Sequence, residues 1–289
     1  MASIKPKTNA EELIDLGNNL IKYLRESSGL LKPDPFYVKK MKNNAEKNKE
    51  GDYAIYWCIL SLLESINSNY DKAKVFYDNA FRVDTNRHDL RPNYIALLFK
   101  LSRFEEVFEQ GISYLKIDNS CEYTFSKIIR SSYFTLDTDS LEEAIHLFEP
   151  KSAVSKEVKS EGIEAVENIL SLARDIESIG VSPTDYTSFM SFLNKFNSKK
   201  SHEEAKVRFS IENRFDQFIR IESFLTINSK QAIDLNAEFD SAFIEYALDN
   251  DFLSSLGSFV TYFKSCEDID DGRENPHAVY ASKNKSMVV

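Results

Sequence analysis

The chain has 289 residues, of which 42% are hydrophobic and 28% charged, and a formal net charge of -10. This composition can bury a substantial core and excludes disorder over the whole length. The chain has only 8 glycines and 7 prolines, too few for the many tight turns of a sandwich or barrel, so long helices are favoured. The negative charge disfavours binding to nucleic-acid phosphates and favours a basic partner over an anionic membrane.

The N-terminal residues predict a pair of helices. Thr8 and Glu11 have the spacing of a capping box, and leucines recur at helical spacing after them. Asp34 and Pro35 follow as the N-cap and first-turn proline of a second helix, which Gly51 ends. This second helix carries a basic run between Lys39 and Lys49. We interpret the run first as a solvated helix face and only second as an anion site.

The next part of the chain contains an internal repeat. An apolar helix over 53–66 is followed by a polar turn and by a second helix that begins near Tyr70. Phe104 follows Tyr70 at the same spacing at which Tyr114 follows Ala80. A helix–turn–helix unit with this period, about 34 residues, is typical of tetratricopeptide repeats.

Residues 50–155 therefore resemble the tetratricopeptide (TPR) family. The first unit matches the family's large, aromatic and small positions best, at Trp57, Leu60, Tyr70, Ala73 and Tyr77. The family's glycine is replaced in the three units by Ser61, Ile95 and Ser132. The resemblance implies a stack of helical hairpins, because a lone hairpin cannot bury its apolar face.

The resemblance also implies that the first helix of each hairpin lines a concave groove. The candidate groove residues are Leu62, Ile66, Ala96, Phe99, Lys100, Tyr133 and Asp137. These side chains could contact a protein partner. Alternatively, the C-terminal helices could fold back and fill the groove.

The second half of the chain is expected to be helical without the repeat. Helices are predicted over 156–179, from Ser182-Pro183, and from a capping box at Ser201 and Glu204 as far as Leu225, followed by two more helices to about Phe263. The expected organisation is all-α: a TPR-like helical-hairpin array over 1–155, a C-terminal helical region over 156–265 that packs on it, and a disordered tail over 266–289.

The sequence contains no pattern that specifies a reaction. The histidines lack metal-ligand spacing, and His202 lies in what is read as the first turn of a helix, where Glu203 and Glu204 serve as capping acids. There is no phosphate-binding loop and no nucleophile motif, and acid pairs such as Glu105-Glu106 suit helix first turns. We therefore predict no catalytic residues, no metal and no cofactor.

Localisation follows from the cysteines and the apolar segments. The three cysteines, Cys58, Cys121 and Cys266, are widely spaced, which is typical of reduced thiols in the cytoplasm. The N-terminus lacks the apolar region of a secretory signal, and no apolar stretch approaches the roughly 20 residues of a membrane span.

We predict a non-enzymatic scaffold or adaptor that binds a protein partner, with a basic partner favoured, through the TPR-like groove or an acidic face. Two alternatives remain: an acidic inhibitor of the immunity type that neutralises a basic toxin or effector, and a divergent all-α enzyme subunit. Nucleic-acid binding through the basic run between Lys39 and Lys49 ranks low.

Overall fold

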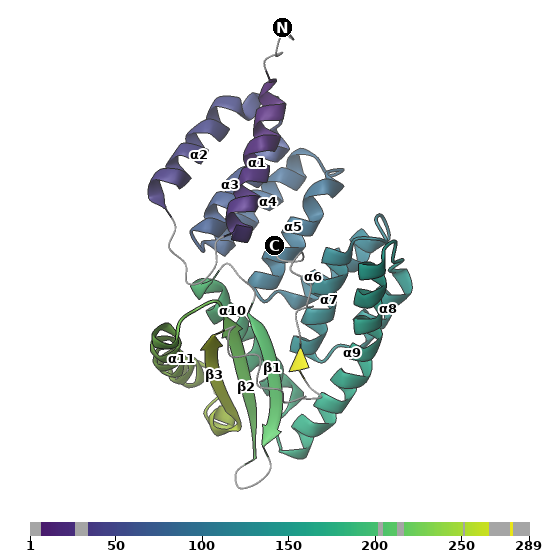
Figure 1. Ribbon diagram of the computed structural model, residues 1–289, viewed down its shortest axis with the longest axis vertical. Coiled ribbons are helices and arrows are strands. Elements are labelled where there is room, and N and C mark those ends of the chain that lie inside the picture. Colours follow the sequence, from purple (N-terminus) through teal and green to yellow (C-terminus); the bar gives the residue numbers. More distant parts are fainter. Residues whose placement is uncertain are drawn as a thin grey trace.

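The computed structural model describes residues 7–26, 34–201, 205–212, 217–250, 252–265 and 278–279. Most of these residues are helical, as the sequence predicts. A small sheet nevertheless forms towards the C-terminal end, so the all-α expectation holds broadly but not for this part. Figure 1 shows the hairpin helices above and to the right, and the sheet with α10 and α11 below.

The N-terminal half consists of consecutive helical pairs. Their helices are α1 (Asn9–Glu26), α2 (Pro35–Asn48), α3 (Tyr53–Ile66), α4 (Tyr70–Val83), α5 (Arg91–Lys100), α6 (Phe104–Leu115), α7 (Glu122–Thr135) and α8 (Asp139–Leu147), with 3-10 turns η1 (Lys49–Gly51) and η2 (His88–Leu90). Helix α1 packs on α3, α5 on α7, and α7 on the later helix α9. The second and third pairs meet through α4 and α5.

The predicted caps of the first pair are confirmed. The Thr8 amide donates to Glu11 at 2.8 Å, and the Glu11 amide donates back to the Thr8 hydroxyl at 3.3 Å. The Asp34 carboxylate accepts from the Phe36 amide at 2.9 Å, and Pro35 occupies the first turn of α2. Gly51 follows α2 at the point where the chain meets α1. Glycine suits this position because a Cβ there would lie 2.5 Å from the Ala10 nitrogen.

The turns inside three hairpins each contain a residue other than glycine with a positive φ. Ser68, Ser102 and Leu136 are the only non-glycine residues with positive φ among the residues that the structure describes, at 59°, 57° and 60°. They are equally spaced along the chain, at the interval that separates Tyr70 from Phe104, and lie in the turns between α3 and α4, α5 and α6, and α7 and α8. Each hairpin therefore reverses at an equivalent position.

Two long helices follow the array, α9 (Ala153–Ser178) and α10 (Pro183–Lys200). Ser152 caps α9 and Ser182 caps α10, with the Asp185 amide donating to the Ser182 hydroxyl at 3.0 Å. Gly180, with φ at 77°, supplies the left-handed residue between them. The predicted break between a helix that ends near residue 179 and one that begins at Pro183 is confirmed.

A glycine sets how closely α9 approaches α7. A Cβ on Gly162 would lie 2.7 Å from Cζ of Phe125, whose ring is stacked on Phe148 at 4.3 Å and cannot retreat easily. We expect Gly162→Ala to lower the free energy of unfolding by about 1–2 kcal/mol in urea titrations, although alanine favours helices. Gly17→Ala is the control: its nearest neighbour is 4.0 Å away, so it should stabilise by up to ~1 kcal/mol. Equal effects of the two substitutions would contradict the close packing.

The predicted helix over 201–225 is wrong, because this segment contains two strands. They are β1 (Lys206–Glu212) and β2 (Phe218–Leu225), which pair antiparallel with Phe209 opposite Ile221. Val207 and Phe209 are buried and alternate with polar residues, which is the period of a strand with one buried face. The proposed capping residue Glu204 and His202 lie outside the described residues.

The last predicted helix, around Phe252 to Phe263, is also wrong. It is replaced by a 3-10 segment, η3 (Leu253–Ser258), and by β3 (Phe259–Ser265), which pairs parallel with β2. The connection between these parallel strands contains α11 (Ser229–Asp249), which confirms the first of the two helices predicted after Leu225. A short strand, β4 (Ala278–Val279), completes the sheet order β3-β2-β1-β4. The rest of the predicted tail over 266–289 lies outside the described residues.

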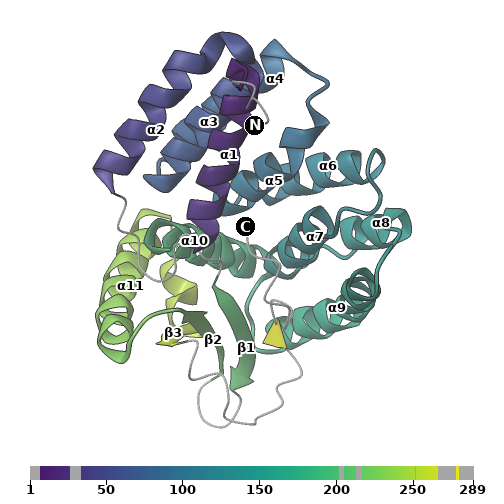
Figure 2. The ribbon, with the colours of Figure 1, turned by 45° about the horizontal axis from the view of Figure 1, so that its top comes forward.

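Helix α10 lies between the hairpins and the sheet, as Figure 2 shows. One side of it carries Phe189, whose ring is stacked on Phe259 of β3 at 4.3 Å and meets Phe243 of α11 edge-on at 5.1 Å. Its other side packs on α5, α7 and α9. Helix α10 therefore packs both against the hairpin helices and against the sheet with α11.

Candidate functional site

Six of the seven groove candidates lie on the first helices of the hairpins and Asp137 lies in the turn after α7, but most of the seven are buried. Ile66 and Phe99 are almost fully buried, at 0% and 1% exposure, and Leu62, Ala96 and Tyr133 are also buried. Lys100 and Asp137 are half-buried. These positions therefore offer little free surface to a partner.

Helix α10 covers the surface of α5 and α7 that carries Phe99 and Tyr133. The side-chain amide of Asn194 donates to the Phe99 carbonyl oxygen at 2.6 Å, and the Tyr186 hydroxyl donates to the Tyr133 carbonyl oxygen at 3.0 Å. The Tyr70 hydroxyl of α4 donates to the Ser198 carbonyl oxygen of α10 at 2.8 Å. These bonds satisfy buried polar groups, so α10 is part of the folded core at this surface.

The remaining candidates have local roles. Asp137 accepts from the amide of Ser140 at 3.0 Å and from its hydroxyl at 2.7 Å, which caps the start of α8. Leu62, Ala96 and Lys100 do come together, because all three line a cavity of about 50 Å³. A cavity of that size holds a few water molecules and not the side chains of a partner.

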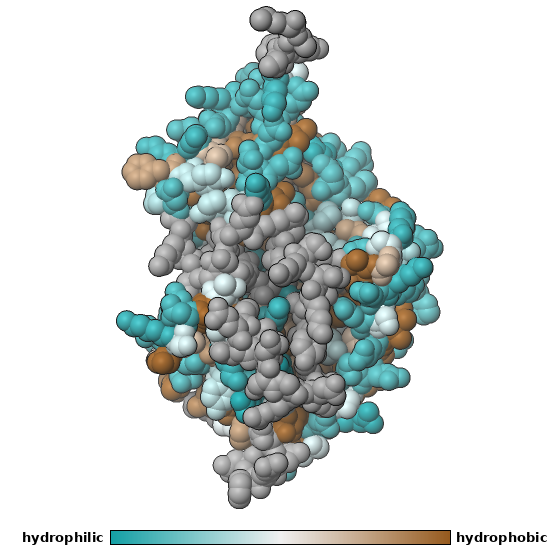
Figure 3. Space-filling model, viewed as in Figure 1, coloured by the Kyte–Doolittle hydropathy of each residue, from teal (hydrophilic) through white to brown (hydrophobic). Residues whose placement is uncertain are grey.

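A larger pocket, of about 370 Å³, lies between α2, α3 and α4. We call it the lysine pocket. Its lining residues are Pro35, Val38, Lys39, Lys42, Leu60, Leu63, Glu64, Asn67, Lys72 and Phe76. Figure 3 shows apolar patches among hydrophilic side chains over this end of the molecule. The size lies within the usual range for small-ligand sites.

The sequence places the lysines of the pocket through helix periodicity. Lys39 and Lys42 are three positions apart on α2, so they lie on one side of it, and Val38 beside them faces inward. Leu60 and Leu63 are buried residues of α3 and form the apolar floor. The basic run was recognised in the sequence, but the pocket was not, because its floor and far wall belong to α3 and α4.

The charges of the lysine pocket do not cancel. Lys72 pairs with Glu64 at 2.7 Å, and its ammonium lies 5.7 Å from the centre of the Phe76 ring. Lys39 and Lys42 are exposed and form no ion pair or hydrogen bond with a described residue. Three lysines and one glutamate give the lining a net charge of +2, whereas the whole chain carries -10.

The geometry of the pocket suits binding. The exposed ammonium groups of Lys39 and Lys42 lie at its rim, and the apolar side chains of Leu60 and Leu63 lie below them. This arrangement fits a ligand in which an anionic group is joined to an apolar group. Among the described residues, no group of three or more His, Cys, Asp and Glu is placed to hold a metal ion. Cys58 lies elsewhere in the core, and burial raises the pKa of its thiol to about 11, so it is protonated at neutral pH.

The acid pairs behave as helix-start residues where the structure describes them. Glu11 and Glu12 lie in the first turn of α1, and Glu105 and Glu106 in that of α6. In the third pair, Glu142 lies in the first turn of α8 and Glu143 beyond it.

A second charged cluster was missed because its strands were read as a helix. Glu222 of β2 is buried on one face of the sheet, where it contacts Arg208 at 3.5 Å, Arg220 at 2.7 Å and Lys264 at 2.5 Å. Burial alone would raise the pKa of Glu222, but the ion pairs with Lys264 and Arg220 outweigh it and hold this pKa below its usual value. The alternation of apolar and polar residues in 206–212 was the available signal.

Comparisons with models of protein families, with curated proteins and with solved structures find no match for this chain. No helix in the described part of the chain has the length and apolar character needed to cross a membrane.

Proposed function

We propose that this protein is a non-enzymatic scaffold that binds an acidic segment of a protein partner in the lysine pocket. The observation that carries the proposal is an apolar pocket with a +2 lining in a chain of charge -10. An apolar side chain of the partner enters between Leu60, Leu63 and Phe76, and carboxylates beside it meet Lys39 and Lys42.

The net charge of the chain favours a basic partner, but local charge governs a contact of this size. Charges farther away than about 10 Å are largely screened at physiological salt. An acidic segment is therefore attracted to Lys39 and Lys42 although the molecule as a whole is acidic.

We further propose that α3 to α8 form TPR-like repeats that serve as a rigid support for the pocket. Support for this comes from Tyr70 and Phe104, which begin α4 and α6, and from the left-handed turn residues that recur at the same interval. Since α10 fills the surface of α5 and α7, the proposed partner site lies on the first two hairpins instead. A cytoplasmic location suits the free thiols of Cys58 and Cys121.

The test measures binding of a fluorescein-labelled synthetic peptide in which one tryptophan is flanked on both sides by glutamates. We expect Lys39→Glu with Lys42→Glu to weaken binding about tenfold, because two attractions become repulsions of up to about 1 kcal/mol each. The matched control is Lys40→Glu with Lys47→Glu, an equal change of charge at exposed α2 positions outside the pocket lining. It should change the affinity less than twofold at physiological salt.

Two comparison probes separate the alternatives. A peptide with alanine in place of tryptophan should bind weakly, since the apolar anchor is lost. A labelled single-stranded oligonucleotide should not bind. Equal losses in the pocket variant and the control variant, or binding of the oligonucleotide but not of the peptide, would overturn the proposed function.

A further inference from the structure

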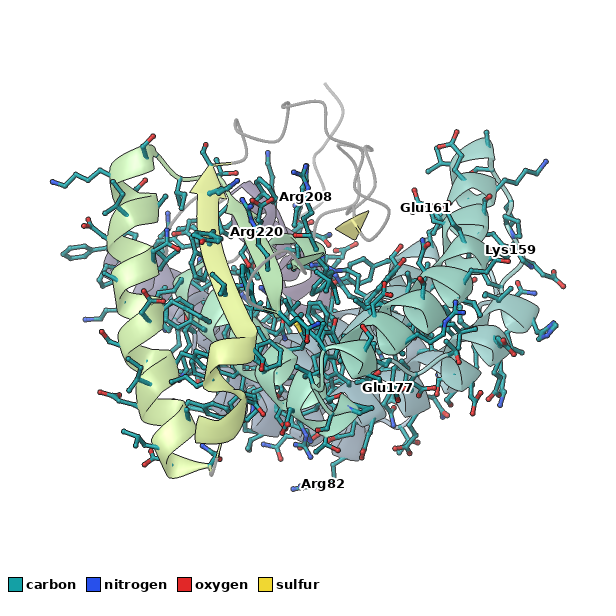
Figure 4. The ribbon with its side chains drawn as sticks, turned by 90° about the horizontal axis from the view of Figure 1, so that it is seen from below. Arg82, Lys159, Glu161, Glu177, Arg208 and Arg220 are labelled. Carbon is teal, nitrogen blue, oxygen red and sulfur yellow. The ribbon has the colours of Figure 1, made fainter. Side chains whose placement is uncertain are left out.

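Helix α11 carries a row of apolar side chains on its exposed side. Five residues recur at helical intervals of four, four, three and four: Ile233, Ala237, Ser241, Ile244 and Leu248. This spacing places them on one side of the helix, and we call them the α11 stripe. All five are exposed, and the large side chains of Ile233, Ile244 and Leu248 are exposed by 69%, 49% and 59%. Figure 4 shows α11, pale green on the left, at the outer edge of the molecule beside β3.

The opposite side of α11 is already used by the fold. Leu235, Phe239 and Phe243 are buried there. Asn236 fastens the helix to β3, because its side chain donates to the Phe263 carbonyl oxygen at 3.2 Å and accepts from the Phe263 amide at 2.8 Å. The helix is therefore held in place. It has apolar residues on two sides, whereas a surface helix normally has one apolar side.

The serine in the α11 stripe does not break its apolar character. The Ser241 hydroxyl donates to the Ala237 carbonyl oxygen at 3.0 Å, so its hydrogen is used within the helix. Single exposed apolar residues are common on proteins, but a continuous row of them marks a surface that contacts another molecule.

One edge of the α11 stripe is acidic. Four exposed acids form a row beside it, at intervals of four, seven and four residues: Asp234, Glu238, Glu245 and Asp249. Glu238 pairs with Lys200, so the attraction for a cationic partner comes mainly from the other three. One lysine and five acids give α11 as a whole a net charge of -4.

We propose that the α11 stripe is the docking surface for a basic amphipathic helix of a protein partner. Apolar side chains of that helix pack against Ile233, Ile244 and Leu248, and lysines or arginines along its edge meet the acids beside them. Charge selects this occupant. Two copies of the chain joined through the stripe would bring together two helices of charge -4, which repel each other, and the same acids repel an anionic membrane surface.

The test measures binding of a labelled synthetic peptide to the full chain. The peptide is as long as α11 and has leucines at every third and fourth position and lysines along both edges. Ile233→Ser with Leu248→Ser should weaken binding at least about tenfold, because the apolar contacts are lost. The matched control is Ile163→Ser with Leu170→Ser on α9, where the two side chains are 56% and 50% exposed. This control should change the affinity less than about twofold.

A second pair of variants tests the acidic edge. Asp234→Asn with Glu245→Gln should weaken binding roughly threefold at low salt and have little effect at high salt, where exposed charges are screened. Glu164→Gln with Glu167→Gln removes the same charge from exposed positions of α9 and should leave the affinity unchanged. The lysine pocket lies between α2, α3 and α4, so its variants should also bind this peptide normally, and the two proposals fail independently.

Sedimentation of the chain without peptide separates the proposed occupant from a second copy. We expect Ile233→Ser with Leu248→Ser to sediment as the unaltered chain does. Self-association that only this variant loses would show that a second copy occupies the α11 stripe, and would overturn the proposal. Equal peptide affinity of this variant and the α9 control, or no binding of the peptide by the unaltered chain, would also overturn it.

Discussion

Phe99→Ala should lower the free energy of unfolding by about 3–5 kcal/mol, the usual cost of removing a fully buried aromatic ring. The ring is 1% exposed and lies 5.7 Å from that of Phe104 and 5.6 Å from that of Phe134. The guanidinium carbon of Arg130 also lies over this ring, 5.3 Å from its centre. Truncation leaves a cavity beneath α10 and removes this cation–π contact. Urea titration followed by far-ultraviolet circular dichroism measures the loss.

The control for Phe99 is Phe36→Ala on α2. Phe36 is 86% exposed, so its replacement should change stability by less than about 0.5 kcal/mol. The comparison also decides what position 99 does. A loss below about 1 kcal/mol with weakened binding of a partner would mean that Phe99 is a contact residue of an accessible groove, and that α10 does not seal this surface.

Glu222→Gln should lower the free energy of unfolding by about 2–4 kcal/mol at pH 7. The substitution removes the negative charge from between Arg208, Arg220 and Lys264 and leaves these cations to repel one another. The expected loss is below the largest values for buried pairs, because the Arg220 and Lys264 side chains are about one-third exposed and can turn to water. The surface pair of Glu238 and Lys200 is the control, and Glu238→Gln should cost less than about 1 kcal/mol.

The effect of Glu222 should depend on pH in a defined direction. Its pKa is lowered in the folded chain by the ion pairs with Lys264 and Arg220, which exceed the opposing effect of burial. Its contribution to stability is therefore complete above the pKa of an unfolded glutamate, about 4.3, and is lost as the pH falls through the lower folded pKa. The difference between the unaltered chain and Glu222→Gln should shrink from pH 5 towards pH 3. A difference that stays constant over this range would contradict the ion-pair account.

The sequence predicted the hairpins because their signals are local. Caps such as Thr8 with Glu11 and Asp34 with Pro35 act within one turn, and they satisfy amides that have no partner inside the helix. The positive φ of Ser68, Ser102 and Leu136 could not be foreseen, because none of them is the glycine that normally marks that conformation. Here the fold imposes the conformation on residues that do not prefer it.

The sheet was missed because the same apolar residues satisfy two periods. Ile211, Phe218, Ile221 and Leu225 recur at helical intervals and fit one stripe of a helix, but Val207, Phe209 and Ile211 alternate strictly with polar residues. The choice between the periods depends on long-range pairing with β2 and, through the α11 crossover, on β3. Such contacts leave no mark within a short window of sequence.

The candidate site was only half predictable for a related reason. The lysines of α2 are visible in the sequence as a basic run, whereas the pocket needs the floor of α3 and the wall of α4. Six of the seven groove residues were placed on the correct helices, whereas Asp137 lies in the turn after α7. The surface that carries Phe99 and Tyr133 is covered by α10, which lies far beyond Tyr133 in the chain and is separated from it by α8 and α9. A run of charged residues can therefore be recognised in the sequence, whereas a pocket formed by three helices cannot.

The position of α10 has a consequence for the order in which the chain can mature during synthesis. The hairpins through α8 leave the ribosome before α10 has been synthesised. Until then, the surface of α5 and α7 that carries Phe99 and Tyr133 is exposed to water, because the hydrogen bonds from Asn194 and Tyr186 cannot yet form. A chain that stops before Pro183 ends with that apolar surface uncovered. We expect such nascent and truncated chains to be prone to aggregation until α10 covers this surface.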